Sequence, residues 1–393
     1  MSRVSLAEGI YWVGAIDWNL RDFHGYHTSR GTTYNSYLIV DEKVALVDTV
    51  KAPFFPEMLG NIKEIIDPGK IDYIITNHVE IDHSGSLPLM VKESGRAKVV
   101  STQKGKEGLK KYYAADWPSL VVKTGDKIDL GKRSLEFIEA PMLHWPDSMF
   151  TYIRQEELLL PNDGFGQHLA TTGRFDDETE VAMEEAAKYY ANILMPFSSL
   201  ITRMLNKIKD MDLKIKMIAP SHGVIWRSEP GRIIEAYTKW AAGETEKKIL
   251  IIYDTMWEST DIMARAILKG VMDAGGEAKI FHLRRNEWSD ILKEVLDAEA
   301  VLVGSPTLHN GLFPPVAGFL TYLKSLKPKG KIGAAFGSYG WSGGAVKKIN
   351  EELKTAGMEV IETDLSFQYR PDKEELNRCY EFGKEVAIKV KMK

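Results

Sequence analysis

The segment His78-Val79-Glu80-Ile81-Asp82-His83 places four metal-ligand side chains within six residues. It follows the apolar run Ile71–Ile75, which predicts a strand, so the segment should lie in a loop at a strand's carboxyl end, where α/β folds place ligands. Four ligands are too many for one metal in so short a loop. They can serve two metals, with His78 and Glu80 facing one, and Asp82 and His83 the other. A solvated polar loop is the alternative, but burying these groups together without a cation would be costly.

Three later residues have the same setting, each just beyond an apolar strand-like run. His144 lies in MLHWPDSM after Leu135–Ile138, and Asp163 lies in LLLPNDGFGQH after Leu158–Leu160. His222 lies in MIAPSHGVIW after Ile215–Ile218. A lone histidine is usually structural, but three such coincidences downstream of HVEIDH are poorly explained that way. We therefore expect all these side chains to converge on one edge of the sheets.

A second set of strand ends, in the C-terminal part of the chain, indicates phosphate binding. After the predicted strand Ile249–Tyr253, a loop with three hydroxyl side chains leads into a helix: Thr255, Met256, Trp257, Glu258, Ser259 and Thr260. Hydroxyls and free amides at a helix N-terminus can cradle a phosphate. The loop has no Lys, Arg, GK[ST] or GxGxxG, which favours one terminal phosphate, as in FMN, over ATP or a dinucleotide. An ordinary N-capped helix is the alternative.

Two further loops strengthen the flavin hypothesis. The first follows strand Ala300–Val303 and contains Ser305, Pro306, Thr307, Leu308, His309 and Asn310. The second follows strand Lys331–Phe336 and contains Ser338, Tyr339, Gly340, Trp341, Ser342 and Gly343. Glycine lets the backbone approach a planar ring closely, and Trp341 or Tyr339 could stack on it.

The elements that must position these residues change character near residue 247. Before it, short apolar runs at 34–40, 44–47, 71–75, 98–100, 135–138, 158–160 and 215–218 predict strands, with helices such as 54–66 and 178–194 between them. After it, five strands alternate strictly with five helices, which describes one doubly wound parallel sheet. We expect two domains, 1–246 and 247–393, joined by the polar linker 241–248.

Composition restricts the class of protein. The chain has 393 residues, 44% of them apolar and 27% charged, with a net charge of −4, which offers no electrostatic case for nucleic acid. A single cysteine, Cys379, excludes an internal disulfide framework and a cysteine-based metal site. We find no secretion signal and no apolar run of membrane-spanning length, so we expect a soluble cytoplasmic protein without a membrane partner.

The order HxExDH, then His, Asp and His after successive strands, resembles the metallo-β-lactamase fold in its flavodiiron (A-type flavoprotein) branch. The three C-terminal loops are similar to the FMN site of flavodoxins, with phosphate on the first and the isoalloxazine between the other two. This resemblance covers nearly the whole chain. It implies an αββα sandwich of the metallo-β-lactamase type followed by a flavodoxin-like five-stranded parallel sheet.

The resemblance also implies the roles of individual residues. It assigns His78, Glu80 and His144 to one iron, Asp82, His83 and His222 to the other, and Asp163 as the bridge. Hydrolases of the superfamily usually show HxHxDH, whereas Glu80 replaces the second histidine here. The extra carboxylate favours the ferric states of a redox cycle.

Several other residues stay open on the sequence alone. His168 is either a residue next to the metal pocket or a surface histidine, and Tyr189 and Tyr190 either reach the pocket or belong to the core. His24, His27 and Trp145 could line its entrance. We expect His282 and the pair Arg284–Arg285 to form a solvated strand end, and Cys379 to be inert.

The resemblance implies an oxidoreductase that reduces O2 to water, NO to N2O, or both, using two irons and FMN. The chain ends without a rubredoxin or flavin reductase module, so rubredoxin or a similar small protein should donate electrons. A head-to-tail homodimer, alone or as a dimer of dimers, would bring the FMN of one chain to the irons of its partner. The alternatives are a zinc metallohydrolase with a regulatory flavodoxin domain, and a pure FMN electron carrier.

Overall fold

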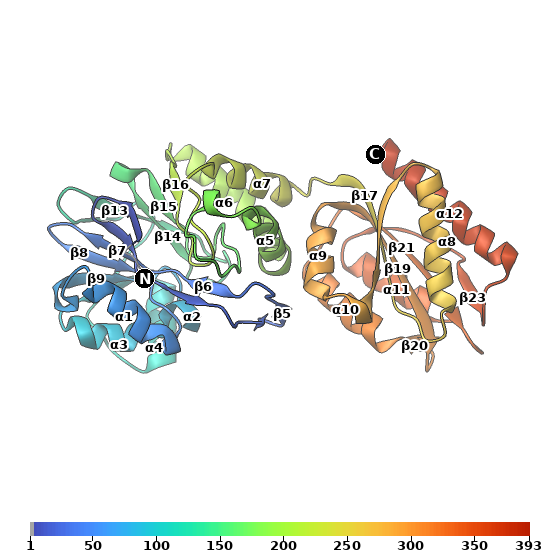
Figure 1. The fold of residues 1–393 in the computed structure, drawn as a ribbon, viewed down its shortest axis with the longest axis horizontal. Coiled ribbons are helices and arrows are strands. Elements are labelled where there is room, and N and C mark those ends of the chain that lie inside the picture. Colours follow the sequence, from blue (N-terminus) through green and yellow to red (C-terminus); the bar gives the residue numbers. More distant parts are fainter. Residues whose placement is uncertain (1–3) are drawn as a thin grey trace. The chain divides into compact units, whose positions relative to one another are not determined.

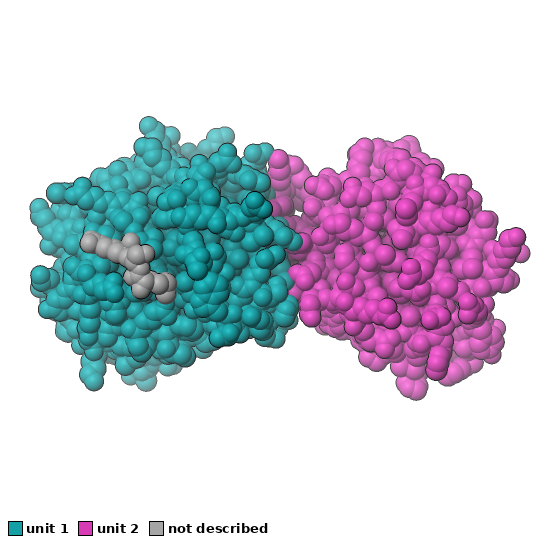
Figure 2. Space-filling view, in the orientation of Figure 1, with its two compact units in different colours: residues 1–189, 199–238 teal, residues 190–198, 239–393 magenta. Residues whose placement is uncertain are grey.

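The computed structural model describes residues 4–393, which form two compact units (Figure 2). One unit comprises the chain up to Tyr189 together with Ser199–Thr238, and the other comprises Tyr190–Ser198 and Lys239–Lys393. Among the described residues, no helix is both long and apolar enough to cross a membrane. A single domain boundary between residues 246 and 247 stays a prediction.

The first unit contains two facing sheets (Figure 1). The order of its seven-stranded sheet is β1 (Val4–Ala7), β2 (Ile10–Trp12), β7 (Tyr37–Val40), β8 (Val44–Val47), β9 (Ile71–Ile75), β10 (Lys98–Ser101) and β11 (Ser119–Val121). The order of its five-stranded sheet is β12 (Lys127–Asp129), β13 (Ser134–Glu139), β14 (Met149–Ile153), β15 (Leu158–Leu160) and β16 (Met217–Ile218). Two small ribbons, β3 (Ala15–Asp17) with β6 (Thr32–Tyr34) and β4 (Asp22–Phe23) with β5 (Tyr26–His27), stand beside them.

Alternation along the strands creates the two cores of this unit. In β7, Tyr37 and Ile39 face the five-stranded sheet, whereas Leu38 faces the helices. In β8, Ala45 and Val47 again face the second sheet, since successive side chains point to opposite faces of a strand. The helical side is covered by α1 (Phe55–Lys63), α3 (Leu87–Ser94) and α4 (Gln103–Tyr113).

Helices also flank the five-stranded sheet, which completes the αββα sandwich expected from the sequence (Figure 1). They are α5 (Ala182–Tyr189), α6 (Ser198–Asp210) and α7 (Pro230–Ala242). Lys207 on α6 donates to the backbone oxygen of Glu139 at the end of β13, at 3.1 Å.

The second unit is the expected doubly wound sheet. Five parallel strands lie in the order β18 (Glu277–His282), β17 (Glu246–Tyr253), β19 (Ala298–Leu308), β21 (Ile332–Tyr339) and β22 (Glu359–Ile361). The short strands β20 (Gly311–Leu312) and β23 (Ser366–Gln368) pair with β19 and β21. The connecting helices are α8 (Ser259–Asp273), α9 (Trp288–Asp297), α10 (Pro314–Ser325), α11 (Ala345–Thr355) and α12 (Lys373–Met392).

The structure differs from the predicted elements at several places. The run 34–40 splits into β6 and β7, because the backbone N–H of Asn35 donates to Ser221 O rather than continuing a ladder. The helix expected from Glu178 begins only at Ala182, because the Glu178 carboxylate first accepts the backbone N–H groups of Arg174 and Phe175. The linker expected over 241–248 is shorter, since α7 runs to Ala242 and β17 begins at Glu246.

The end of the predicted helix 178–194 also changes character. Residues Tyr190–Leu194 form a π-helical turn that belongs to the second unit. There, Asn192 Nδ2 donates to Ser289 O at 3.1 Å and the Tyr322 hydroxyl donates to Asn192 Oδ1 at 2.6 Å. A segment from the middle of the chain therefore packs against helices α9 and α10 of the second unit.

Candidate metal centre and flavin site

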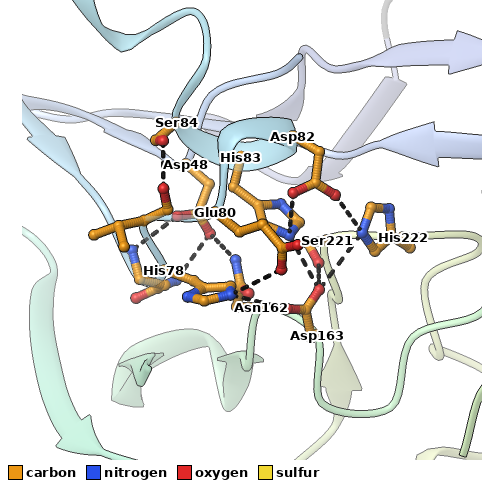
Figure 3. Close-up of polar contacts among 12 residues, drawn as sticks. Asp48, His78, Glu80, Asp82, His83, Ser84, Asn162, Asp163, Ser221 and His222 are labelled. Carbon is orange, nitrogen blue, oxygen red and sulfur yellow. Dashed lines mark hydrogen bonds and ion pairs between the residues drawn. The ribbon is translucent and has the colours of Figure 1, made fainter. Parts of the chain in front are cut away.

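The seven ligand-type side chains come from strand ends of the first unit. His78 and Glu80 lie between β9 and the short helix α2 (Ile81–Ser84), which carries Asp82 and His83. The other three follow β13, β15 and β16: His144, Asp163 and His222. Parallel pairing of β15 with β16 and of β8 with β9 brings these carboxyl ends to a common edge (Figure 3).

The structure gathers these side chains into two groups. In each group, every residue offers one ligand atom, and these atoms all lie within 4.8 Å of one another. The first group is His78, Glu80, His144 and Asp163, and the second is Asp82, His83 and His222. In the first group, Glu80 Oε2 lies 3.2 Å from His78 Nε2 and 3.3 Å from His144 Nε2. In the second, Asp82 Oδ2 lies 3.1 Å from His222 Nε2. All seven sequence candidates are therefore brought together.

Asp163 faces both groups, one oxygen to each. Its Oδ1 lies 3.1 Å from His83 Nε2 and 3.5 Å from His222 Nε2. Its Oδ2 lies 3.5 Å from His144 Nε2 and 3.7 Å from His78 Nε2. A carboxylate can bridge two cations in this arrangement, because each oxygen carries its own lone pairs.

The chemistry of the donor set fits cations. Both carboxylate oxygens of Asp82, Asp163 Oδ2 and His83 Nε2 are buried without a hydrogen-bond partner in the described part of the chain, although their neighbours stand only 3.1–3.7 Å away. Buried polar groups are normally satisfied, so converging atoms that satisfy one another poorly indicate a missing shared partner. Three buried carboxylates also require positive charge to offset their desolvation.

Hydrogen bonds from the far side orient two of the imidazoles. His78 Nδ1 lies 3.0 Å from Asp147 Oδ2, which also accepts the backbone N–H of Val79 at 2.8 Å. His222 Nδ1 lies 2.7 Å from the backbone oxygen of Thr33. With Nδ1 donating, each ring can offer its Nε2 lone pair to a cation once Nε2 has lost its proton, as ligating histidines do.

A buried network around Asp48 supports the loop that carries His78. Asp48 accepts the backbone N–H of Asn77 at 2.8 Å and the side-chain amides of Asn77 and Asn162 at 3.2 and 3.1 Å. Ser221 donates to Asp163 Oδ1 at 2.9 Å (Figure 3). Sequence reasoning missed Asp48 and Asp147. Asp48 directly follows the apolar strand Val44–Val47, so the rule that found His144 and Asp163 could have found it.

The electrostatics of the cluster keep its carboxylates ionised. Burial alone would raise the pKa of Glu80, but hydrogen bonds from His144, His24 and His78 outweigh it and hold that pKa far below its ordinary value. Burial likewise opposes ionisation of Asp163, yet His83 and His144 keep its pKa well below the usual range. Anionic oxygens are the donors that hard cations prefer.

The open candidates take distinct places. His24 Nε2 lies 2.6 Å from Glu80 Oε1, and its side chain is 40% exposed, so it stands at the rim of the cluster. The Trp145 ring lies 5.1 Å from the His78 ring, whereas His27 belongs to the β4–β5 hairpin.

His168 is not a surface histidine. It is 1% exposed, its Nδ1 lies 2.8 Å from Thr32 Oγ1, and its ring lies 4.9 Å from that of His222. Burial lowers its pKa well below the ordinary value, so the ring is neutral. The tyrosine beside it is Tyr189, at 5.0 Å, while Tyr190 contacts Trp240 and Ser198.

In the second unit, the three candidate flavin loops follow neighbouring strands. Tyr253 at the end of β17 pairs with Gly304 of β19, which pairs with Phe336 of β21. Strand β18 lies on one side of β17, whereas β19 and the later strands lie on the other side, so the strand order reverses between β17 and β19. Ligands of such sheets bind at this switch point. A Cβ at Gly304 would lie 2.3 Å from the Phe336 ring, so this close approach requires glycine.

The first loop offers a donor without a partner. Thr255 Oγ1 is buried and has no hydrogen-bond partner among residues 4–393. Thr260 Oγ1 lies 3.2 Å from Ser338 Oγ, which joins the first loop to the third. An unsatisfied hydroxyl beside the N-terminus of the fifteen-residue helix α8 fits a phosphate.

The first and third loops each carry an exposed tryptophan. Trp257 and Trp341 are 86% and 79% exposed, and Asn310 Oδ1 accepts from Ser342 Oγ at 2.5 Å. Planar aromatic side chains beside a phosphate cradle fit an isoalloxazine ring.

The expected solvated strand end is confirmed for Arg284 and Arg285, which are exposed, but His282 and Arg284 also have a partner that was not expected. Both side chains bind the fully buried carboxylate of Asp254, which directly precedes the first loop. Sequence reasoning missed this contact because Asp254 lies about thirty residues earlier in the chain. Cys379 is buried in α12, in the core rather than at the surface, and its expected inertness stays a prediction.

Comparisons with known proteins agree with both units. A family model described as ODP family beta lactamase matches residues 32–223, and a flavodoxin model matches residues 251–383. The nitric oxide reductase of Moorella thermoacetica is 54% identical over 393 residues, with 98% of each chain covered.

Two solved structures are similar to the whole chain. Rubredoxin oxygen:oxidoreductase from Desulfovibrio gigas has a TM-score of 0.97 at 38% identity, covering 100% of this chain and 99% of that chain. The flavodiiron protein from Giardia intestinalis has a TM-score of 0.95 at 36% identity, covering 100% and 97%. The likeness extends over both the metal centre and the three loops.

Proposed function

Because this chain belongs to the flavodiiron protein family, we propose that it is an oxidoreductase that reduces O2 to water, NO to N2O, or both, at a non-haem diiron site served by FMN. When bound, two irons and FMN supply one-electron and two-electron redox chemistry. The zinc hydrolase alternative is not favoured, since the comparisons name oxidoreductases.

The observation that supports the metal assignment best is Asp163, with one carboxylate oxygen facing each group. We assign His78, Glu80 and His144 to one iron and Asp82, His83 and His222 to the other, with Asp163 between them. Three carboxylates and four neutral imidazoles leave two ferrous ions with a net charge of about +1, which one hydroxide would balance. Asp147 orients the His78 ring and the backbone oxygen of Thr33 orients the His222 ring, so these two rings need not turn to bind a metal.

In the second unit, we assign FMN to the loops that follow β17, β19 and β21. Thr255 and Thr260 face the phosphate, and residues 305–310 and 338–343 flank the ring. The switch-point topology and the unsatisfied Thr255 hydroxyl support this assignment.

Metal and flavin analysis of protein produced with ample iron tests the cofactor set. We expect two irons and one FMN per chain, together with consumption of O2 or NO when a reductant is supplied. Zinc alone, combined with metal-dependent hydrolysis and no reductase activity, would contradict the proposal.

For the donor, we propose rubredoxin or a similar small redox protein, because the Desulfovibrio gigas structure carries rubredoxin in its name. Anaerobic mixing with reduced rubredoxin should reduce the flavin within the turnover time. A flavin that accepts electrons only from chemical reductants would exclude this donor.

We also propose that the FMN of one chain serves the irons of its partner in a head-to-tail homodimer. Fast electron transfer needs close cofactors, and a C2 pair would hold two equivalent composite sites. Mixing a metal-free chain (His78→Ala with Asp163→Ala) with a chain that cannot bind FMN should restore activity in the mixed dimers. An active monomer with unchanged turnover would refute the pairing.

A further inference from the structure

A buried carboxylate stands directly before the loop that we assign to the flavin phosphate. Asp254 follows the last residue of β17 and is 0% exposed. Arg284 Nε donates to both of its oxygens, at 2.9 and 3.0 Å, and His282 Nε2 lies 3.1 Å from Oδ1. Arg284, just beyond the end of the neighbouring strand β18, therefore supplies the charge that balances Asp254, and His282 adds a contact to one of its oxygens.

Asp254 and Arg284 also bind both backbone polar groups of Thr255, the first residue of the loop. The Thr255 backbone N–H donates to Asp254 Oδ1 at 2.6 Å, and Arg284 Nη2 donates to Thr255 O at 2.6 Å. The Thr255 hydroxyl is left without a partner in the described part of the chain. The backbone is thus fixed while the one group suited to a ligand stays available.

A second contact connects this group to helix α8. The His282 ring stacks on Tyr253, with centroids 5.3 Å apart and planes at 14°, and the Tyr253 hydroxyl donates to Asp261 in the first turn of α8. Arg284 also lies over the Phe313 ring, 5.2 Å from its centroid. The loop is therefore held at its start and at the turn where it becomes a helix.

The phosphate loop has no positive charge of its own, so the negative charge of Asp254 beside it matters for anion binding. Residues 255–260 contain no Lys or Arg, and Glu258 lies among them. A phosphate monoester carries about −1.5 to −2 at pH 7, and an uncompensated buried carboxylate at Asp254 would repel it. Arg284 cancels that charge from behind the loop, so the neutral donors can bind the anion.

We propose that Arg284, through Asp254, is a positioning and charge-balancing residue that makes the flavin site select a phosphorylated flavin (FMN) over riboflavin. Arg284 does not contact the ligand itself. It fixes the Thr255 peptide and removes the repulsion that Asp254 would exert on the phosphate. This inference rests on the proposed FMN site.

The test is the ratio of FMN affinity to riboflavin affinity, measured by quenching of flavin fluorescence on full-length protein freed of flavin. Arg284→Met should weaken FMN binding on the order of 10- to 100-fold, because it leaves a buried charge unpaired beside the phosphate. Riboflavin has no phosphate, so its affinity should change by less than about threefold on the same reasoning. Arg285→Met, at the exposed neighbouring position, is the matched control and should change neither affinity.

The double variant Asp254→Asn with Arg284→Met separates charge from folding. It removes the carboxylate together with its counter-charge, so FMN affinity should recover most of the loss. Equal weakening of both flavins by Arg284→Met, an unchanged ratio, or no recovery in the double variant would each overturn the inference. If the parent protein bound neither flavin, the proposed FMN site itself would be wrong, which is a distinguishable result.

Discussion

Replacing Asp147 tests how much the orientation of His78 contributes to metal binding. Asp147 Oδ2 accepts from His78 Nδ1 at 3.0 Å and from the Val79 backbone N–H at 2.8 Å, and the residue is 5% exposed. Asp147→Ala removes both acceptors, so the His78 ring loses its fixed tautomer and a buried N–H is left unpaired. Loss of such an outer partner costs about 10- to 100-fold in metal affinity, which corresponds to about 1.4 to 2.7 kcal/mol.

Asp147→Asn separates the charge from the hydrogen bonds. One oxygen accepts both bonds, and an asparagine oxygen can take its place, so we expect a loss of no more than about tenfold. The assay is iron retained per chain during titration with a chelator, with Asp116→Ala at an exposed position of the same unit as the control. Iron held by Asp147→Ala as tightly as by the parent would refute the role given to Asp147.

Three further substitutions or treatments have defined outcomes. The guanidinium of Arg174 is buried above the Trp12 ring and has no hydrogen-bond partner among the described residues, so Arg174→Met should stabilise the chain by about 1–3 kcal/mol in urea unfolding. Destabilisation by this substitution would contradict the reading of Arg174 as an unpaired buried charge. Burial raises the pKa of Cys379 to about 12, so the native thiol should resist alkylation at pH 8. Its contribution to stability should be complete below about pH 9 and decline as the pH rises toward 12; rapid native alkylation would contradict this. Asp163→Asn should retain the fold and FMN but lose magnetic coupling between the irons, and full reductase activity in this variant would exclude the bridge.

The sequence predicted most of the positions that carry chemistry, because ligand-type residues directly follow apolar strands. Strands at 44–47, 71–75 and 158–160 have the predicted bounds, since two-residue alternation or a short apolar run is a local signal. His144, Asp163 and His222 were found by the same rule. Their convergence needed the parallel pairing of β15 with β16, which the order of elements already implied.

The missed features depend on partners far apart in the sequence. Asp147 supports His78 across 69 residues, and Arg284 supports Asp254 across 30 residues, with no local pattern to mark either pair. Arg284 looked like part of a solvated strand end because charged dipeptides at strand ends usually are. The position of Tyr190 could not be predicted either, because a π-helical turn begins at this residue and places it in the second unit.

The most direct test of the proposed function is anaerobic stopped-flow mixing of the fully reduced protein with O2 and with NO in parallel. One FMN hydroquinone and two ferrous ions hold four electrons, which match one O2 reduced to two waters or four NO reduced to two N2O. We expect oxidation of the flavin and the irons together, in that stoichiometry, with at least one of the two gases. Flavin oxidation without any change at the metals, with both gases, would contradict a diiron reductase.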